Sequence, residues 1–228
     1  MKTAYFRSRV DRGVALPIAL FFLIVISLLA TVGMRRATIG EALSRNQIDF
    51  ETARQAAEAA LRDAERDLAS TATVLPRPGA LCTRGADERP IDPGILNTAF
   101  NAQCNRGQCR MGGANPTAYY GASVYSTTPT NPQPWWPRTH GGIWDDTTTP
   151  KPQVVGNSCV FNGGIPIGVF TGTARLAGVR RQPEYMVEFF NRTSDDPMFR
   201  ITARGYGLGP NTEVVIQGFF KPASLAIL

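Results

Sequence analysis

The stretch RGVALPIALFFLIVISLLATVGMRR, residues 12–36, decides the fold of this 228-residue chain. Between Val14 and Met34 it holds 21 residues without a charge. A helix of that length rises about 30 Å, which matches the hydrocarbon core of a bilayer. The apolar region of a cleaved signal peptide is shorter, about 7–15 residues, and no small-residue cleavage site follows this one. We therefore expect the segment to stay on the mature protein as a membrane-spanning helix.

Positive charge flanks the segment on both sides. Residues 1–13 hold four basic residues and Asp11, a net charge of +3, and Arg35 and Arg36 follow the segment. The N-terminal flank is the more densely basic, which favours one pass through the inner membrane with a cytoplasmic N-terminus and a periplasmic C-terminal domain. This flank supplies half of the formal net charge of +6. The rest of the chain is therefore only weakly basic, and we expect no nucleic-acid partner.

All four cysteines, Cys82, Cys104, Cys109 and Cys159, lie beyond the apolar segment. On the extracytoplasmic side two disulfides are the ordinary outcome, and four cysteines allow three pairings between which the sequence does not choose. A zinc site is the alternative. The gap between Cys104 and Cys109 is wider than in a CxxC pair, however, and the single histidine, His140, is far along the chain. We expect disulfides and no metal.

Residues 37–69 continue the helix instead of entering a linker. They contain no proline and one glycine, and they are rich in alanine, arginine and glutamate, which are strong helix formers. The sequence predicts one helix from residue 14 to about 69, with an apolar half at 14–35 and an amphipathic half at 36–70. Its alanine-rich stripe favours packing on a sheet over the alternative, a juxtamembrane coiled coil. The stripe consists of Leu43, Phe50, Ala53, Ala57, Ala60 or Leu61, Ala64 and Leu68, and Asp63 falls with the charged, exposed side.

Residues 71–228 predict a globular domain that is rich in loops. Eleven of the 17 prolines lie between Val74 and Pro152, which predicts surface loops over 76–160 in place of regular helices or central strands. A sheet is predicted over 165–220, because the segments 184–190, 199–207 and 213–220 are rich in β-branched and aromatic residues, and 165–172 is a fourth candidate strand.

The connections within this predicted sheet are short, which favours an antiparallel meander with a turn at 207–211. In 199–204 apolar residues alternate with Arg200, Thr202 and Arg204, which predicts a half-buried strand with one face in water. The expected fold class is α+β, with a long N-terminal helix packed on an antiparallel β-sheet.

Several segments resemble a known family. Arg12-Gly13-Val14-Ala15-Leu16, after a short basic leader, looks like the class III cleavage motif of prepilins. FETARQAAEAALRDAE (50–65) and FRITARGYGLGPNTEVVIQGFF (199–220) are similar to the PilX-type minor pilins of type IV pili. The resemblance implies the type IV pilin fold, cleavage between Gly13 and Val14, a leader peptide at 1–13 and N-methylation of Val14. Residues 14–35 would then serve as membrane span and filament core.

One residue departs from the pattern of major pilins. They have glutamate at the fifth mature position, where this chain has Ile18, and that carboxylate is thought to meet the terminal amine of a neighbouring subunit. An unpaired charge inside an apolar filament costs several kcal/mol, so a subunit without the carboxylate suits the tip better than repeated positions along the shaft. PilX-type and K-type pilins share this absence.

The resemblance implies a minor pilin that primes assembly of a type IV pilus or sits at its tip, and supports pilus biogenesis, twitching motility and adhesion. The implied partners are other minor pilins, the major pilin, a pilus-tip adhesin and the prepilin peptidase, in the inner membrane and then in the assembled pilus at the cell surface. A K-type pseudopilin of a type II secretion system is the alternative. A membrane-anchored enzyme or receptor is a third hypothesis, but no catalytic motif supports it. We expect no enzymatic activity and no cofactor.

Two smaller features leave alternatives open. The pairs Asp145-Asp146 and Asp195-Asp196 either bind calcium or are solvated turn residues, and neither has EF-hand spacing. In the proline-rich stretch 127–152, the side chains of Trp135, Trp136 and Trp144 either anchor a partner or cover an irregular core.

Overall fold

The computed structural model of the chain describes residues 15–69, 77–85, 88, 99–101, 103–110, 137, 139, 142–145, 151, 158–190 and 198–221. The chain divides into two compact units, Met1–Ile48 and Asp49–Leu228. Most of the predicted loop region 76–160 lies outside the described residues.

A single helix, α1 (Ala15–Leu68), crosses the boundary between these two units. This helix confirms the prediction. No proline follows Pro17 within it, and Pro17 lies in the first turn, where the missing N–H would have no helical partner. The last turn closes with a hydrogen bond from the Ala69 amide to the Glu65 carbonyl, 2.8 Å between N and O.

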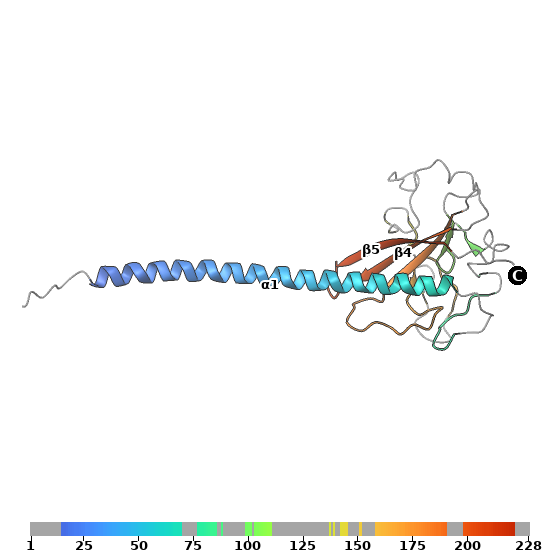
Figure 1. Ribbon diagram of the computed structural model, residues 1–228, viewed down its shortest axis with the longest axis horizontal. Helices are drawn as coiled ribbons and strands as arrows, with labels where there is room; N and C mark the ends of the chain where they lie inside the picture. Colours follow the sequence, from blue (N-terminus) through green and yellow to red (C-terminus); the bar gives the residue numbers. More distant parts are fainter. Residues whose placement is uncertain are drawn as a thin grey trace, which may run out of the picture. The chain divides into compact units, whose positions relative to one another are not determined.

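Three strands form the predicted antiparallel meander: β3 (Glu184–Phe190), β4 (Met198–Tyr206) and β5 (Glu213–Phe220). Figure 1 shows β4 and β5 side by side. They are joined by a turn in which the Gly207 amide donates to the Thr212 carbonyl over 3.0 Å. The register runs without a bulge from Phe199 opposite Phe220 to Tyr206 opposite Glu213.

Two short strands complete the sheet and differ from the prediction. β1 (Gln108–Arg110) pairs parallel with β3, so the whole sheet is mixed, and the sequence did not indicate this strand because three residues carry too little alternation. β2 (Ile165–Pro166) pairs antiparallel with β3 but covers only the first two residues of the predicted strand 165–172. Beyond it, Gly168 and Gly172 have positive φ angles of 81° and 75°, which turn the chain away from the sheet.

The C-terminal half of α1 packs on the sheet, as the alanine stripe predicted. Gly205 of β4 permits the close approach, since a Cβ atom there would lie 2.0 Å from the Ala53 carbonyl oxygen. Leu43 and Phe50, which belong to the predicted stripe, are 64% and 50% exposed. The helix residues with buried apolar side chains are Ala53, Ala56, Ala57, Ala60, Ala64 and Leu68.

The opposite face of β4 is buried, so the prediction of a face in water was wrong. Arg200, Thr202 and Arg204 are 1%, 0% and 3% exposed. Arg200 lies opposite Glu188 of β3 and donates two hydrogen bonds to its carboxylate, at 2.6 and 2.7 Å. Burial raises the pKa of Glu188, and the hydrogen bonds and charge of Arg200 act against that rise. The alternation identified two faces correctly, but it does not show that neighbouring segments cover both.

Candidate functional site

The apolar half of α1 is the first candidate surface. No residue of its most apolar 18-residue stretch is buried, and the helix is long and apolar enough to cross a membrane by length and composition. A surface of this kind needs lipid or another protein to cover it. Its large exposed side chains are Leu16, Ile18, Leu20, Phe21, Phe22, Leu23, Ile24, Ile26, Leu28, Leu29, Val32 and Met34.

The polar side chains within this half are accommodated by the helix itself. The hydroxyls of Ser27 and Thr31 donate to carbonyls three or four residues earlier, at 2.7 and 2.8 Å between oxygens. A hydroxyl satisfied by its own backbone does not need water. The geometry therefore suits an apolar environment up to Arg35 and Arg36, which are exposed.

Of the residues predicted to matter for processing and assembly, the structure describes only some. Gly13 and Val14 lie outside the described residues, and Ile18 lies near the start of α1 with a side chain that is 49% exposed. At this position the helix therefore presents an aliphatic side chain and no carboxylate.

A buried charged cluster fixes the C-terminal end of α1 to the sheet. Asp67 receives hydrogen bonds from Arg84 Nε and Nη2, the latter at 2.6 Å, and from the Tyr185 hydroxyl at 3.0 Å. The Arg84 guanidinium also stacks over the ring of Phe170, 4.0 Å from its centre. Burial, reinforced by Asp67 and Asp63, raises the pKa of Tyr185 well above its ordinary value, so its phenol stays protonated and remains a donor. Removing one partner of such a buried pair typically costs about 3–5 kcal/mol.

Two more aspartates of α1 attach the helix to loops of the same unit. Asp63 is buried and accepts from the Gly168 amide at 2.8 Å and from the Thr171 and Thr173 hydroxyls. The prediction that placed Asp63 on the exposed side was therefore wrong. Asp49 accepts hydrogen bonds from the turn between β4 and β5, namely from the amides of Leu208 and Gly209 and the hydroxyl of Thr212.

The spacing of these aspartates was a signal that the sequence analysis missed. Positions 49 and 63 are two heptads apart, and 63 and 67 are one helical turn apart, so all three lie along the alanine stripe. A carboxylate within an apolar stripe indicates a buried acceptor whose donors come from elsewhere in the chain.

The four cysteines form two disulfides. Cys82 pairs with Cys159, 77 residues away, and Cys104 pairs with Cys109. The longer link joins the segment after α1 to the segment before β2, and the Cys82 amide also donates to the Val169 carbonyl over 2.9 Å. The shorter link encloses a tight turn in which Cys104 and Arg106 have positive φ angles of 54° and 51°. The pairing that the sequence left open is therefore decided by the fold.

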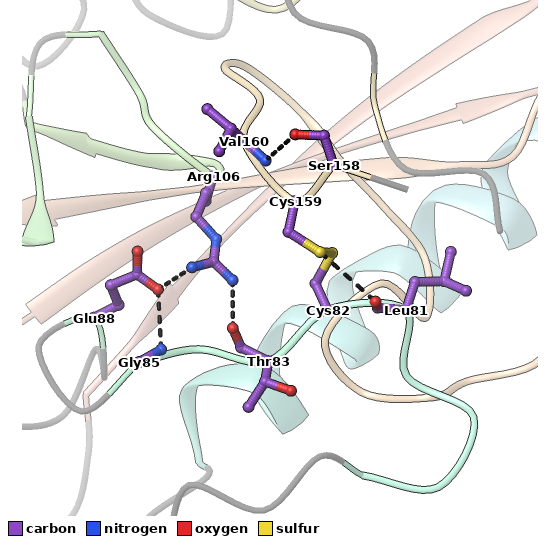
Figure 2. Close-up of a disulfide and its surroundings, with 9 residues drawn as sticks. All are labelled: Leu81, Cys82, Thr83, Gly85, Glu88, Arg106, Ser158, Cys159 and Val160. Carbon is purple, nitrogen blue, oxygen red and sulfur yellow. Dashed lines mark hydrogen bonds and ion pairs between the residues drawn. A yellow bond between two sulfur atoms is a disulfide. The ribbon is translucent and has the colours of Figure 1, made fainter. Parts of the chain in front are cut away.

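Figure 2 shows how the Cys82–Cys159 disulfide is supported. Arg106 reaches across from the turn before β1, pairs with the Glu88 carboxylate and donates to the Thr83 carbonyl. Glu88 in turn accepts from the Gly85 amide at 3.0 Å. Burial by itself would raise the pKa of Glu88, but the hydrogen bonds from Arg106 and Gly85 and the charges of the neighbouring arginines together lower it, which favours the carboxylate anion. This network ties the turn before β1 to the residues next to Cys82.

Trp144 is part of the core, so of its two predicted roles, anchoring a partner or covering a core, the second is correct for this residue. It is fully buried, donates to Glu184 Oε2 at 2.9 Å, and has the Arg204 guanidinium 4.5 Å from its ring centre. Lys151 pairs with the same Glu184 oxygen at 2.9 Å. Trp135, Trp136 and His140 lie outside the described residues.

Asp145 lies in a recess of about 570 Å³ beside the β4–β5 turn. Its carboxylate is 3.4 Å from Arg204 and 3.7 Å from Arg181. Cations therefore surround this carboxylate, an arrangement that favours an ion-pair role over calcium binding. Asp146, Asp195 and Asp196 lie outside the described residues.

Two family models match the chain. One, described as type IV pilus assembly protein PilX, C-terminal part, matches residues 105–222, and this alone covers more than half of the chain. The other, the PilX N-terminal model, matches residues 12–62. No curated protein and no solved structure matches the chain.

Proposed function

This chain belongs to the PilX family of type IV pilus assembly proteins, and we propose that it primes assembly of the pilus and sits at its tip. The observation on which this rests is the apolar, carboxylate-free start of α1 at Ile18. We also propose that residues 1–13 are a leader removed by the prepilin peptidase, which would make Ile18 the fifth mature residue.

The physical argument concerns a buried charge. In a filament core made from apolar helices, the terminal amine of each subunit needs a nearby anion, because an unpaired ion in such surroundings costs several kcal/mol. A subunit with Ile18 offers no anion to the neighbour beyond it, so it is tolerated where no such neighbour exists. That position is the tip, which is also the first part of a filament to be assembled.

The two halves of α1 suit such a subunit. The exposed apolar half provides a membrane-stored segment and then a filament-core segment, while the half from Asp49 onward is held by the sheet through alanines and aspartates. The globular unit would then be displayed at the cell surface, where it supports twitching and adhesion together with the major pilin, other minor pilins and a tip adhesin. A K-type pseudopilin would share Ile18, but both matching family models are PilX models, so we do not propose that role.

The tip assignment is tested by returning the carboxylate. In a deletion strain, which we expect to lose most surface pili and twitching, wild-type chain should restore pili with label at their ends. Ile18→Glu should move immunogold label into the shaft, because the anion now pairs with the amine of a neighbour. Ile18→Gln, similar in size but neutral, should keep the wild-type distribution. Normal piliation in the deletion strain would refute the priming role, and shaft label in the wild type would refute the tip position.

Processing is tested separately. Gly13→Leu should leave the leader attached, since the peptidase of this family cuts after glycine, and the chain should migrate as a larger precursor. Intact mass of the wild-type chain should correspond to residues 14–228 with a methylated Val14 amine. A variant band of the mature size would contradict this processing.

A further inference from the structure

Among the described parts of the chain, β5 is an edge strand whose middle lacks the usual protection of an edge. It stands at the end of the strand order β1-β3-β4-β5, and each of its residues is at least partly exposed, whereas β3 and β4 are almost wholly buried. Natural edge strands are commonly guarded by charges, proline or a bulge. Between Val214 and Phe220 there is no charge or proline, and the register with β4 has no bulge. The outer backbone groups of this strand therefore form a regular row suited to another strand.

The side chains of β5 separate into two rows. One row faces α1, since a Cβ atom on Gly218 would lie 3.3 Å from Leu61, and Ile216 and Phe220 pack against the main core. The other row is exposed, with Val215 and Phe219 38% and 57% exposed. In chain order, this outer row reads Glu213, Val215, Gln217, Phe219 and then Lys221, the exposed residue after the strand.

This outer row is complementary to its own reverse. We propose that a second copy of this chain pairs its β5 antiparallel with β5 at this edge, about a two-fold axis through Gln217. Glu213 of each copy, whose carboxylate also pairs with Arg204 of its own chain at 3.1 Å, then faces Lys221 of the other, Val215 faces Phe219, and Gln217 faces Gln217. Residues directly opposite in an antiparallel pair lie on the same face, so opposite charges meet at both ends and apolar side chains meet between them.

Geometry and charge select this register over its neighbours. In an edge strand, the N–H and C=O groups of every second residue point outward. The two-fold axis of a symmetric antiparallel pair must therefore pass through a residue, and the neighbouring registers are those in which this axis moves by one residue. An axis through Ile216 would place Glu213 opposite Phe219 and leave Lys221 opposite Asn211. A parallel, in-register pair would place Glu213 beside Glu213. On the row that faces α1, the proposed register sets Ile216 opposite Gly218, a large residue against a small one.

The proposed pair has a defined orientation. Gly205, the register partner of Val214, lies against Ala53, and Gly218 lies near Leu61, so β5 runs in the same direction as residues 49–68 of α1. An antiparallel β5 pair therefore sets these helix segments of the two copies in opposite directions. Copies anchored in one membrane or packed in one filament have helices that run in the same direction, so this contact joins copies from different membranes or filaments, and it does not depend on the tip position proposed above.

Cysteine trapping tests the pair in the purified, full-length chain in detergent, with its two disulfides intact. Gln217→Cys should give a disulfide-linked dimer under mild oxidation, because the two residues 217 face each other within disulfide reach. Val215→Cys is the matched control on the same row. Its two copies would be four residues apart along the strand, about 13 Å, which is beyond disulfide reach. Equal trapping of both variants, or trapping of neither, would overturn the proposal.

Charge reversal tests the register. In the Gln217→Cys background, Lys221→Glu should reduce the trapping rate about tenfold, because both ends of the pair then place like charges together. Lys221→Arg keeps the charge and should trap at the original rate. Circular dichroism of each variant should match that of the unsubstituted chain, which separates a lost contact from a lost fold. A trapping rate insensitive to Lys221→Glu would overturn this register.

Discussion

At the scale of single residues, three aspartates of α1 make the main polar contacts between the helix and the rest of the described globular unit. Asp49, Asp63 and Asp67 all lie along the apolar stripe, and each accepts hydrogen bonds from residues more than 15 positions away in sequence. Asp63 and Asp67 are buried, and a buried carboxylate is costly unless its oxygens are satisfied, so these two also specify which loop must lie against the helix. The alanines allow the helix to approach the sheet closely, and the aspartates fix the position of the helix along its own axis relative to the segments that it contacts.

Asp49 predicts a pH dependence. Its hydrogen bonds from Thr212 and then Gly209 hold its pKa below the ordinary value of 3.8. A carboxylate with a lowered folded pKa stabilises the fold above its unfolded pKa, and this stabilisation is lost as the pH falls through the folded pKa. Asp49→Asn should therefore lower the urea midpoint at about pH 7, and the difference from wild type should shrink towards about pH 3.

The exposed Glu51, half a turn further along α1, provides the control for this pH dependence. Glu51→Gln removes a charge of the same sign near the same place without touching the β4–β5 turn. Its effect on the midpoint should be small at both pH values. If Asp49→Asn lost equal stability at both, the loss would reflect the side chain's shape and not its charge.

At the scale of elements, the helix and sheet meet through small residues. The backbone of β4 at Gly205 approaches the backbone of α1, and a Cβ atom there would lie 2.0 Å from Ala53 O and 2.3 Å from Ala57 N. Backbone atoms of two regular elements cannot yield locally, so any larger residue would separate the elements themselves. Close approach in turn aligns the aspartates with their donors.

Gly205→Ala should therefore destabilise the globular unit by about 1–3 kcal/mol, the range for overpacking in a core. Gly218→Ala is the matched control on the same sheet. Its new Cβ would lie 3.3 Å from Leu61 Cδ1, the end of a flexible side chain that can move, so we expect a cost below about 1 kcal/mol. Urea unfolding followed by circular dichroism measures both. Equal effects would show that the helix backbone tolerates the extra methyl group.

At the scale of the whole molecule, long-range links join segments of the globular unit that lie far apart in sequence. Cys82–Cys159 spans 77 residues, and β4 is buried on both of its faces, with ion pairs such as Glu188–Arg200 on one of them. Such links suit an extracytoplasmic compartment, where disulfides persist. They also connect parts of a proline-rich region that the described strands do not include.

The two disulfides should differ in their contribution. In the chain-entropy description, closing the 77-residue separation contributes about 4.5 kcal/mol and the five-residue separation about 2 kcal/mol. Replacing Cys82 and Cys159 with serine should thus lower the free energy of unfolding roughly twice as much as replacing Cys104 and Cys109. Denaturant titrations of the two double variants measure the difference. A larger loss from the short link would show that its tight turn matters more than chain entropy.

The features that the sequence by itself determined are local ones. The helix from Ala15 to Leu68 and the strands β3, β4 and β5 follow from periodicity and propensity within each segment, and the predicted bounds agree with the structure to within two residues. The family could also be identified from the sequence, because most of its motifs lie in those same segments. Each signal is contained in neighbouring residues, so no knowledge of the fold is needed to read it.

Only the tertiary structure decided what covers each face. Arg200 and Asp63 have charged side chains, which are usually exposed. Both are buried here because Glu188 and the loop around Thr171 supply hydrogen-bonding partners from other parts of the chain. The disulfide pairing and the parallel strand β1 were decided in the same way, by which segments meet in space. Periodicity shows that a helix or strand has two faces, whereas the burial of a face depends on contacts between residues far apart in sequence.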